Sequence, residues 1–196
     1  MVEADAMNVK PKQSNLTRID VHFPKWQEVL YVFGVVVFLV YSWAVRGFFY
    51  QLSSLRLYHT IGEILAVFSY VMAFALLESI LVISGLVFLG IVLPQKWLRD
   101  GFAYKGFVVA LVMGVAMIGL HYYMFSLRYA MPPLGILFSG FGAAIILLVV
   151  LILISQNNAR LQSFLLSMAE RVQIFLYLYI PLGLVGLAVV FLRNLS

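Results

Sequence analysis

Glu78 is the residue of this sequence that stands out chemically, because it is an acid in the middle of an apolar run. Residues 61–92 contain only one other charge, Glu63. A charge at the centre of a bilayer costs about 2.5–3.5 kcal/mol on insertion scales, so such a side chain faces protein or water rather than lipid. Because no cation occurs at a matching depth in the other apolar runs, we expect Glu78 to carry its proton.

Two roles for Glu78 follow from that position. It could couple the uptake of a proton or a cation to a function of the protein. It could instead be a neutral, structural group that is hydrogen-bonded across helices to serine or backbone partners. Ala75, Val82 and Gly85 share its side of the predicted helix and would let a neighbouring helix approach.

A second group of residues could bind a metal or a haem. His59 and Glu63 are four residues apart and share a face of a helix, and His121 is expected at the same membrane level. Two imidazoles and a carboxylate can hold a divalent metal, and two imidazoles can clamp a haem. Histidines also collect at membrane interfaces without any ligand, so the sequence requires no cofactor.

The basic residues of one predicted loop, Lys96, Arg99 and Lys105, could contact lipid phosphate headgroups. No catalytic machinery accompanies them: the chain lacks a Walker loop, a dinucleotide fingerprint and a His-Glu-x-x-His motif. It also has no cysteine, and its net charge of +5 is not gathered into a basic run that would indicate nucleic acid. We therefore predict a protein that is not an enzyme and binds no nucleic acid.

The composition predicts the fold class. Hydrophobic residues make up 64% of the 196 residues and charged residues 11%, against about 45–50% and 25% in soluble domains. We predict an all-α integral membrane protein, a bundle of about five transmembrane helices in a single domain at 26–196, after a polar, disordered cytoplasmic tail at 1–25. The predicted spans are residues 28–45, 61–92, 107–125, 134–154 and 174–192.

An additional amphipathic helix, lying at the membrane interface, is predicted for residues 159–173. Leu161, Phe164, Leu165, Met168 and Val172 recur at helical spacing, with polar residues between them. The polar residues 155–158 separate this helix from the preceding span.

The distribution of lysine and arginine predicts the orientation. With a cytoplasmic N-terminus, nine of the thirteen basic residues fall on the cytoplasmic side and four outside. The positive-inside rule therefore favours an internal N-terminus and an external C-terminus. We expect a multi-pass protein of a prokaryotic plasma (inner) membrane.

Small residues at three- or four-residue spacing mark faces on which helices can pack closely in lipid. The partner of such a face is a helix of the same chain or, as an alternative, a second copy. These faces are formed by Ala110 and Gly114, by Gly135, Ser139 and Gly142, and by Gly183 and Gly186.

These observations favour a non-enzymatic accessory, scaffold or assembly subunit that contacts lipid and other membrane subunits or a second copy of itself. One alternative is a proton-linked transporter or channel component that uses Glu78. Another is a haem or metal protein that uses His59 and His121. An enzyme acting on lipids ranks below these, because no nucleophile or base accompanies the basic loop.

Overall fold

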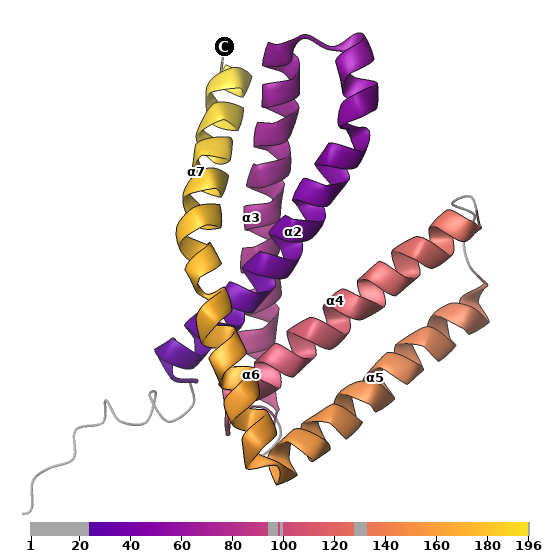
Figure 1. The fold of residues 1–196 in the computed structure, drawn as a ribbon, viewed down its shortest axis with the longest axis vertical. Helices are drawn as coiled ribbons and strands as arrows, with labels where there is room; N and C mark the ends of the chain where they lie inside the picture. Colours follow the sequence, from indigo (N-terminus) through magenta and orange to yellow (C-terminus); the bar gives the residue numbers. More distant parts are fainter. Residues whose placement is uncertain (1–23, 94–97, 99, 128–132, 196) are drawn as a thin grey trace, which may run out of the picture.

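The computed structural model describes residues 24–93, 98, 100–127 and 133–195, and this part of the chain is helical without strands (Figure 1). Nearly all of the predicted tail lies outside the described residues. Six helices are described: α2 (Trp26–Tyr58), α3 (Ile61–Val92), α4 (Phe102–Ser126), α5 (Leu134–Asn157), α6 (Ala159–Val172) and α7 (Ile174–Leu195).

The helices form two groups that meet at one end of the molecule (Figure 1). In the first group, α3 packs against both α2 and α7. In the second, α4 and α5 form a hairpin that diverges from the first group, with α4 contacting α2. The short helix α6 lies where the groups meet and contacts α2, α4 and α5. A wedge-shaped arrangement results, closed at the α6 end.

Local sequence explains where several helices begin. Thr60 caps α3: its hydroxyl accepts from the Glu63 backbone N–H at 3.4 Å, and its own N–H donates to the Glu63 carboxylate at 2.8 Å. Asn158 caps α6 by accepting from the N–H groups of Arg160 and Leu161. Gly101, before α4, has a φ of 75°, a left-handed conformation that glycine adopts at low cost.

Helix α2 is longer than the first predicted span, 28–45, and continues as helix to Tyr58. The predicted span ends at residue 45, where the sequence becomes aromatic and polar. No proline interrupts residues 46–58, and glutamine, leucine and arginine in this segment are good helix formers. With 33 residues α2 is roughly 50 Å long at about 1.5 Å per residue, more than the roughly 30 Å hydrocarbon core requires.

The other helices are close to the predicted segments. Helix α5 begins at the predicted residue, after Pro133, and α6 ends one residue before the predicted 173. Helix α4 begins five residues earlier than the predicted 107, and α7 extends to Leu195. Among the described residues, five helices are long and apolar enough to cross a membrane, with α6 and α7 counted together as Ala159–Leu195.

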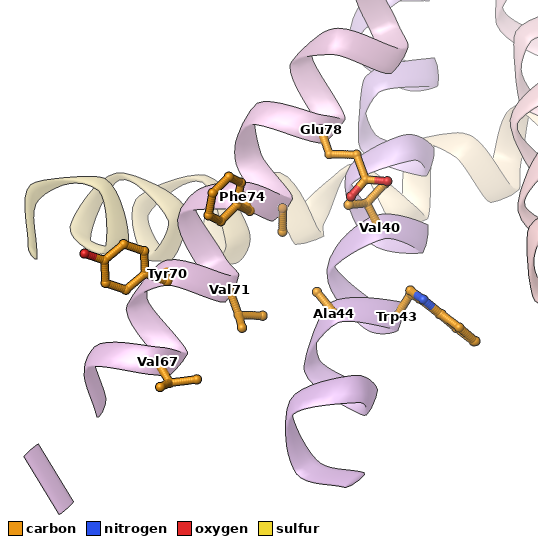
Figure 2. A pocket seen from close by; sticks show the side chains of 9 residues that line it. Val40, Trp43, Ala44, Val67, Tyr70, Val71, Phe74 and Glu78 are labelled. Carbon is orange, nitrogen blue, oxygen red and sulfur yellow. The ribbon is translucent and has the colours of Figure 1, made fainter. Parts of the chain in front are cut away.

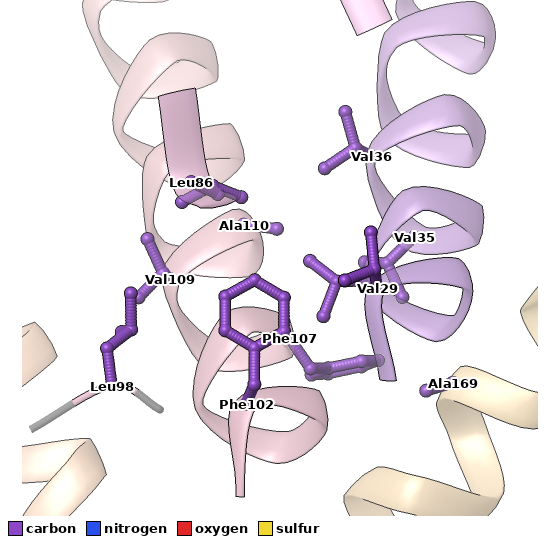
Figure 3. Packing of buried hydrophobic residues seen from close by; sticks show 11 residues of the cluster. Val29, Val35, Val36, Leu86, Leu98, Phe102, Phe107, Val109, Ala110 and Ala169 are labelled. Carbon is purple, nitrogen blue, oxygen red and sulfur yellow. The ribbon is translucent and has the colours of Figure 1, made fainter. Parts of the chain in front are cut away.

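Two apolar clusters hold the helices together. The first lies near the closed end, where Val32, Phe102, Phe107 and Ala169 join α2, α4 and α6; most of its members are labelled in Figure 3. The second joins α2, α3 and α7 around Tyr41, whose hydroxyl donates to the Met72 carbonyl at 3.3 Å. Helices α2 and α3 contribute to both clusters, since Leu86 of α3 belongs to the first and Met72 of α3 to the second.

The predicted small-residue faces have different surroundings. A methyl group on Gly186 would lie 2.6 Å from the Ser69 carbonyl oxygen, and one on Gly183 would lie 2.9 Å from Leu76 Cβ, so α7 and α3 pack with little space between them. On α4, Ala110 is buried and Gly114 faces Leu39.

The face on α5 is open in this chain. Nothing lies within 4 Å of a methyl group placed on Gly135 or Gly142, and Ser139 is exposed with its hydroxyl bonded to the Ile136 carbonyl of its own helix. None of the residues in the most apolar stretch of α5 is buried.

Candidate functional site

Glu78 lies near the midpoint of α3 and lines a cavity between α3 and α2 (Figure 2). The cavity has a volume of about 430 Å³. Its α2 side is formed by Val40, Trp43 and Ala44. Figure 2 shows the Glu78 carboxyl extending from α3 toward Val40.

The α3 side of this first cavity is aromatic as well as acidic. Tyr70, Phe74 and Glu78 follow one another at four-residue spacing and therefore lie on one side of the helix. With Trp43 from α2, three aromatic side chains and one carboxyl line the same space. Phe74 is 66% exposed, so it is free to contact a molecule that enters.

A second cavity, of about 380 Å³, extends from the same residues toward α4. It shares Val40, Trp43 and Glu78 with the first cavity. Helix α4 contributes Gly114, His121 and three methionines, Met113, Met117 and Met124. Glu78 is therefore accessible from both sides of the α2–α3 contact.

Trp43 connects the acid to a polar cluster farther along α2 and α4. The Arg46 guanidinium lies 4.9 Å from the centre of the Trp43 ring, and the His121 ring meets the indole edge-on with centroids 5.0 Å apart. Arg46 also donates a hydrogen bond of 2.6 Å to the Tyr122 hydroxyl. These contacts join α2 to α4 beside the second cavity and hold the indole of Trp43 in place.

Within the described part of the chain, no hydrogen bond or ion pair holds the Glu78 carboxyl. The neighbouring Ser79 is fully buried and donates to the Ala75 carbonyl of its own helix at 2.7 Å, rather than to Glu78. Of the small residues on the Glu78 side, Ala75 and Val82 line the cavities, and no atom lies within 4 Å of a methyl group placed on Gly85. The carboxyl thus faces open space and not a packed helix.

The second predicted group, His59, Glu63 and His121, is separated into two places in the structure. His59 Nδ1 lies 3.5 Å from a Glu63 carboxylate oxygen, and both side chains are about half exposed. The Glu63 carboxylate is also bonded to Thr60 and so belongs to the cap of α3. His121 instead packs against Trp43. Among the described residues, no three histidine, cysteine or acidic side chains are close enough together to hold a metal ion.

Of the predicted headgroup contacts, only Lys105 is among the described residues; Lys96 and Arg99 are not. Lys105 is buried, with 2% of its surface exposed. Its ammonium lies 5.7 Å from the centre of the Tyr104 ring.

The sequence identified Glu78 but not the aromatic residues around it. Trp43 falls near the end of the predicted span 28–45, whereas in the structure it lies near the middle of α2 and lines the cavities with Glu78. The four-residue spacing of Tyr70, Phe74 and Glu78 was a usable signal for the α3 side of the cavity.

The chain matches no protein-family model, and neither the curated proteins nor the solved structures include a significant match to it. The fold and the site together describe a helical bundle with five candidate membrane spans and an acidic cavity.

Proposed function

We propose that this chain is a multi-pass protein of a prokaryotic plasma membrane, in which Glu78 exchanges a proton for a cation, as a proton-linked transporter or channel component. The observation that supports this most directly is that Glu78 lines both cavities and has no hydrogen-bonding partner in the described part of the chain. A structural acid would instead be expected to be hydrogen-bonded to a neighbouring helix.

The physical basis is the cost of an uncompensated charge. A charge in the apolar part of a bilayer is costly unless a charge of opposite sign accompanies it. The entry of a cation would favour release of the proton, and the return of the proton would favour release of the cation. The cavity would alternate between two electrically neutral states, one with a proton on Glu78 and one with a cation beside the Glu78 carboxylate. This exchange requires no catalytic group.

Infrared spectroscopy of the protein in lipid nanodiscs tests whether Glu78 holds a proton. The wild type should show the carbonyl stretch of a protonated carboxylic acid at neutral pH, shifted by exchange into heavy water. Glu78→Gln should remove this band, whereas Glu170→Gln, on the exposed surface of α6, should leave it. A wild-type spectrum without the band, or a band that persists in Glu78→Gln, contradicts the proposal.

A second candidate function is an accessory or assembly subunit, and one observation favours it. The apolar stretch of α5 is unburied, and the described part of the chain does not cover its glycine and serine face, Gly135, Ser139 and Gly142. In lipid, such a face permits close packing against another helix. The partner would be another membrane subunit or a second copy.

Cysteine crosslinking in native membranes tests this candidate, because the chain has no cysteine of its own. A Gly142→Cys protein that docks through α5 should form a crosslinked band, and Phe74→Cys, on the cavity side of α3, should not. A Gly142→Cys protein that stays monomeric and reacts freely with a lipid-soluble thiol reagent contradicts docking through this face.

A further inference from the structure

The two cavities that share Glu78 have the size and the lining of a site for one class of molecule. We propose that they bind a hydrophobic organic monocation, such as a quaternary ammonium or phosphonium compound, with its charge at Glu78. This inference rests on the proposed function and adds to it the chemistry of the ligand.

The volumes suit a small organic molecule. Ligand sites commonly enclose about 300–1,000 Å³, lined mainly by apolar groups with a few polar ones. The cavities measure about 430 and 380 Å³ and meet at Val40, Trp43 and Glu78. A metal ion or a hydrated inorganic cation would leave most of this apolar surface unused and would lack further oxygen ligands.

The aromatic side of the site favours a positive charge with an apolar shell. Phe74 and Tyr70 lie one and two turns from Glu78 on α3, and all three side chains line the first cavity. Aromatic faces attract cations, and they recognise quaternary ammonium groups in this way. The Trp43 ring already has the Arg46 guanidinium near it at 4.9 Å, so we assign the ligand to the Tyr70 and Phe74 side.

The other side of the site is flexible. Met113, Met117 and Met124 line the second cavity from α4. Methionine side chains are unbranched and polarisable, and they adapt to ligands of different outline. We therefore expect the site to tolerate several hydrophobic cations and to discriminate mainly by charge.

The ionisable groups around the site determine how binding depends on pH. Glu78 is the acid that lines the cavities, while Tyr70 from α3 and His121 from α4 line one cavity each. Arg46 from α2 lies behind Trp43 and donates to Tyr122 of α4. A proton on Glu78 removes the charge that the ligand requires, so lowering the pH should weaken binding, and a proton on His121 would act in the same direction.

Binding of tetraphenylphosphonium to the purified full-length protein in nanodiscs tests the inference. We expect Glu78→Gln to raise the dissociation constant of the phosphonium at least about tenfold, because the variant loses a favourable charge contact with it. Phe74→Leu, which keeps the carboxyl, should weaken it a few-fold. Glu170→Gln changes the net charge by the same amount on α6 and should bind as the wild type does.

Two further measurements separate the outcomes. Uncharged triphenylphosphine should bind equally to the wild type and to Glu78→Gln, and wild-type affinity for the phosphonium should fall as the pH is lowered. If Glu78 holds a proton by infrared spectroscopy but Glu78→Gln binds the phosphonium as tightly as the wild type, the ligand assignment is wrong and the proposed function stands. If Glu78→Gln does not fold, equal affinity of Phe74→Leu and the wild type at every pH overturns the inference.

Discussion

At the scale of single residues, the arrangement around Glu78 combines one feature that was visible in the sequence with others that were not. An acid in a long apolar run is unusual whatever the fold, so Glu78 could be identified from its neighbours in the chain alone. Where Trp43 lies along its helix could not be predicted, because this depends on where α2 ends. Because residues 46–58 remain helical, Trp43 lies near the middle of its helix and not at the end.

Tyr41 provides a test of the packing between α2, α3 and α7 that is independent of Glu78. Its side chain is fully buried, stacks on Tyr179 with ring centroids 4.7 Å apart, and donates to the Met72 carbonyl. Tyr41→Phe keeps the ring and removes the hydrogen bond, so it should lower the free energy of unfolding by about 0.5–1.5 kcal/mol.

Reversible unfolding in mixed detergent micelles measures this change. Tyr177→Phe is the matched control, because Tyr177 is 80% exposed and the same atom is removed there. Equal stability of Tyr41→Phe, Tyr177→Phe and the wild type would show that the hydroxyl of Tyr41 contributes nothing to the α2–α3 contact.

At the scale of helices, local signals predicted helix ends better than they predicted packing. The start of α5 followed from Pro133, and that of α6 from the polar residues before it. Glycine spacing predicted faces that permit close contact, but it could not show which faces would be filled. Gly186 meets the backbone of α3, whereas Gly142 meets nothing, although both have the same local pattern of small residues.

Alanine at these two glycines should therefore have opposite effects on stability. A methyl group on Gly186 would lie 2.6 Å from the Ser69 carbonyl oxygen and 3.1 Å from the Ala73 nitrogen, so the helices must separate. We expect Gly186→Ala to destabilise the protein by about 1–3 kcal/mol, as overpacking does. Gly142→Ala meets no atom and restricts the unfolded chain, so it should stabilise by about 0.5–1 kcal/mol.

Thermal unfolding followed by size-exclusion chromatography measures both variants beside the wild type. A Gly186→Ala protein as stable as Gly142→Ala would mean that α7 does not pack on α3 as described. If Gly142→Ala is instead destabilised in native membranes alone, another protein contacts α5 there.

At the scale of the whole molecule, the apolar segments predicted a helical chain with five long apolar helices, but the wedge between the two helix groups could not be predicted. Spans 61–92 and 107–125 are consecutive in the sequence, and consecutive helices usually pack together. In the structure α4 contacts α2 instead of packing along α3, and the second cavity at Glu78 lies between the diverging helices. Such an arrangement depends on many weak contacts that no short motif encodes.

An engineered disulfide tests the closed end of this wedge. A Cβ atom on Gly34 of α2 would lie 3.5 Å from the Cβ of Gln173, the residue between α6 and α7. It would also lie 2.9 Å from the Gln173 Cα, so the backbones must move slightly apart when a side chain replaces Gly34. Disulfides join Cβ atoms about 3.5–4.5 Å apart. The double variant Gly34→Cys/Gln173→Cys should therefore oxidise to an internally crosslinked monomer with changed gel mobility.

The control pair, Gly142→Cys/Gln173→Cys, places a thiol on the open face of α5 and should remain reduced within the monomer. Because the native chain has no cysteine, any crosslink comes from the introduced pair. An uncrosslinked Gly34→Cys/Gln173→Cys protein under the same oxidation would contradict the described contact between α2 and the α6–α7 junction.

The orientation of the bundle can be tested from the way the helix ends are grouped. The beginnings of α2 and α4 and the ends of α3 and α5 gather around α6, at the closed end of the molecule (Figure 1). Lys25, Lys105, Arg160 and Arg171 belong to these segments. By the positive-inside rule this end should be cytoplasmic.

A single cysteine in place of the exposed Ser163 of α6 should therefore react with a membrane-impermeant thiol reagent only after cells expressing the protein are permeabilised. A cysteine in place of the exposed Ser53, near the other end of α2, should react in intact cells. The reverse pattern would invert the orientation, and equal labelling of both residues in intact cells would contradict insertion of the bundle across the membrane.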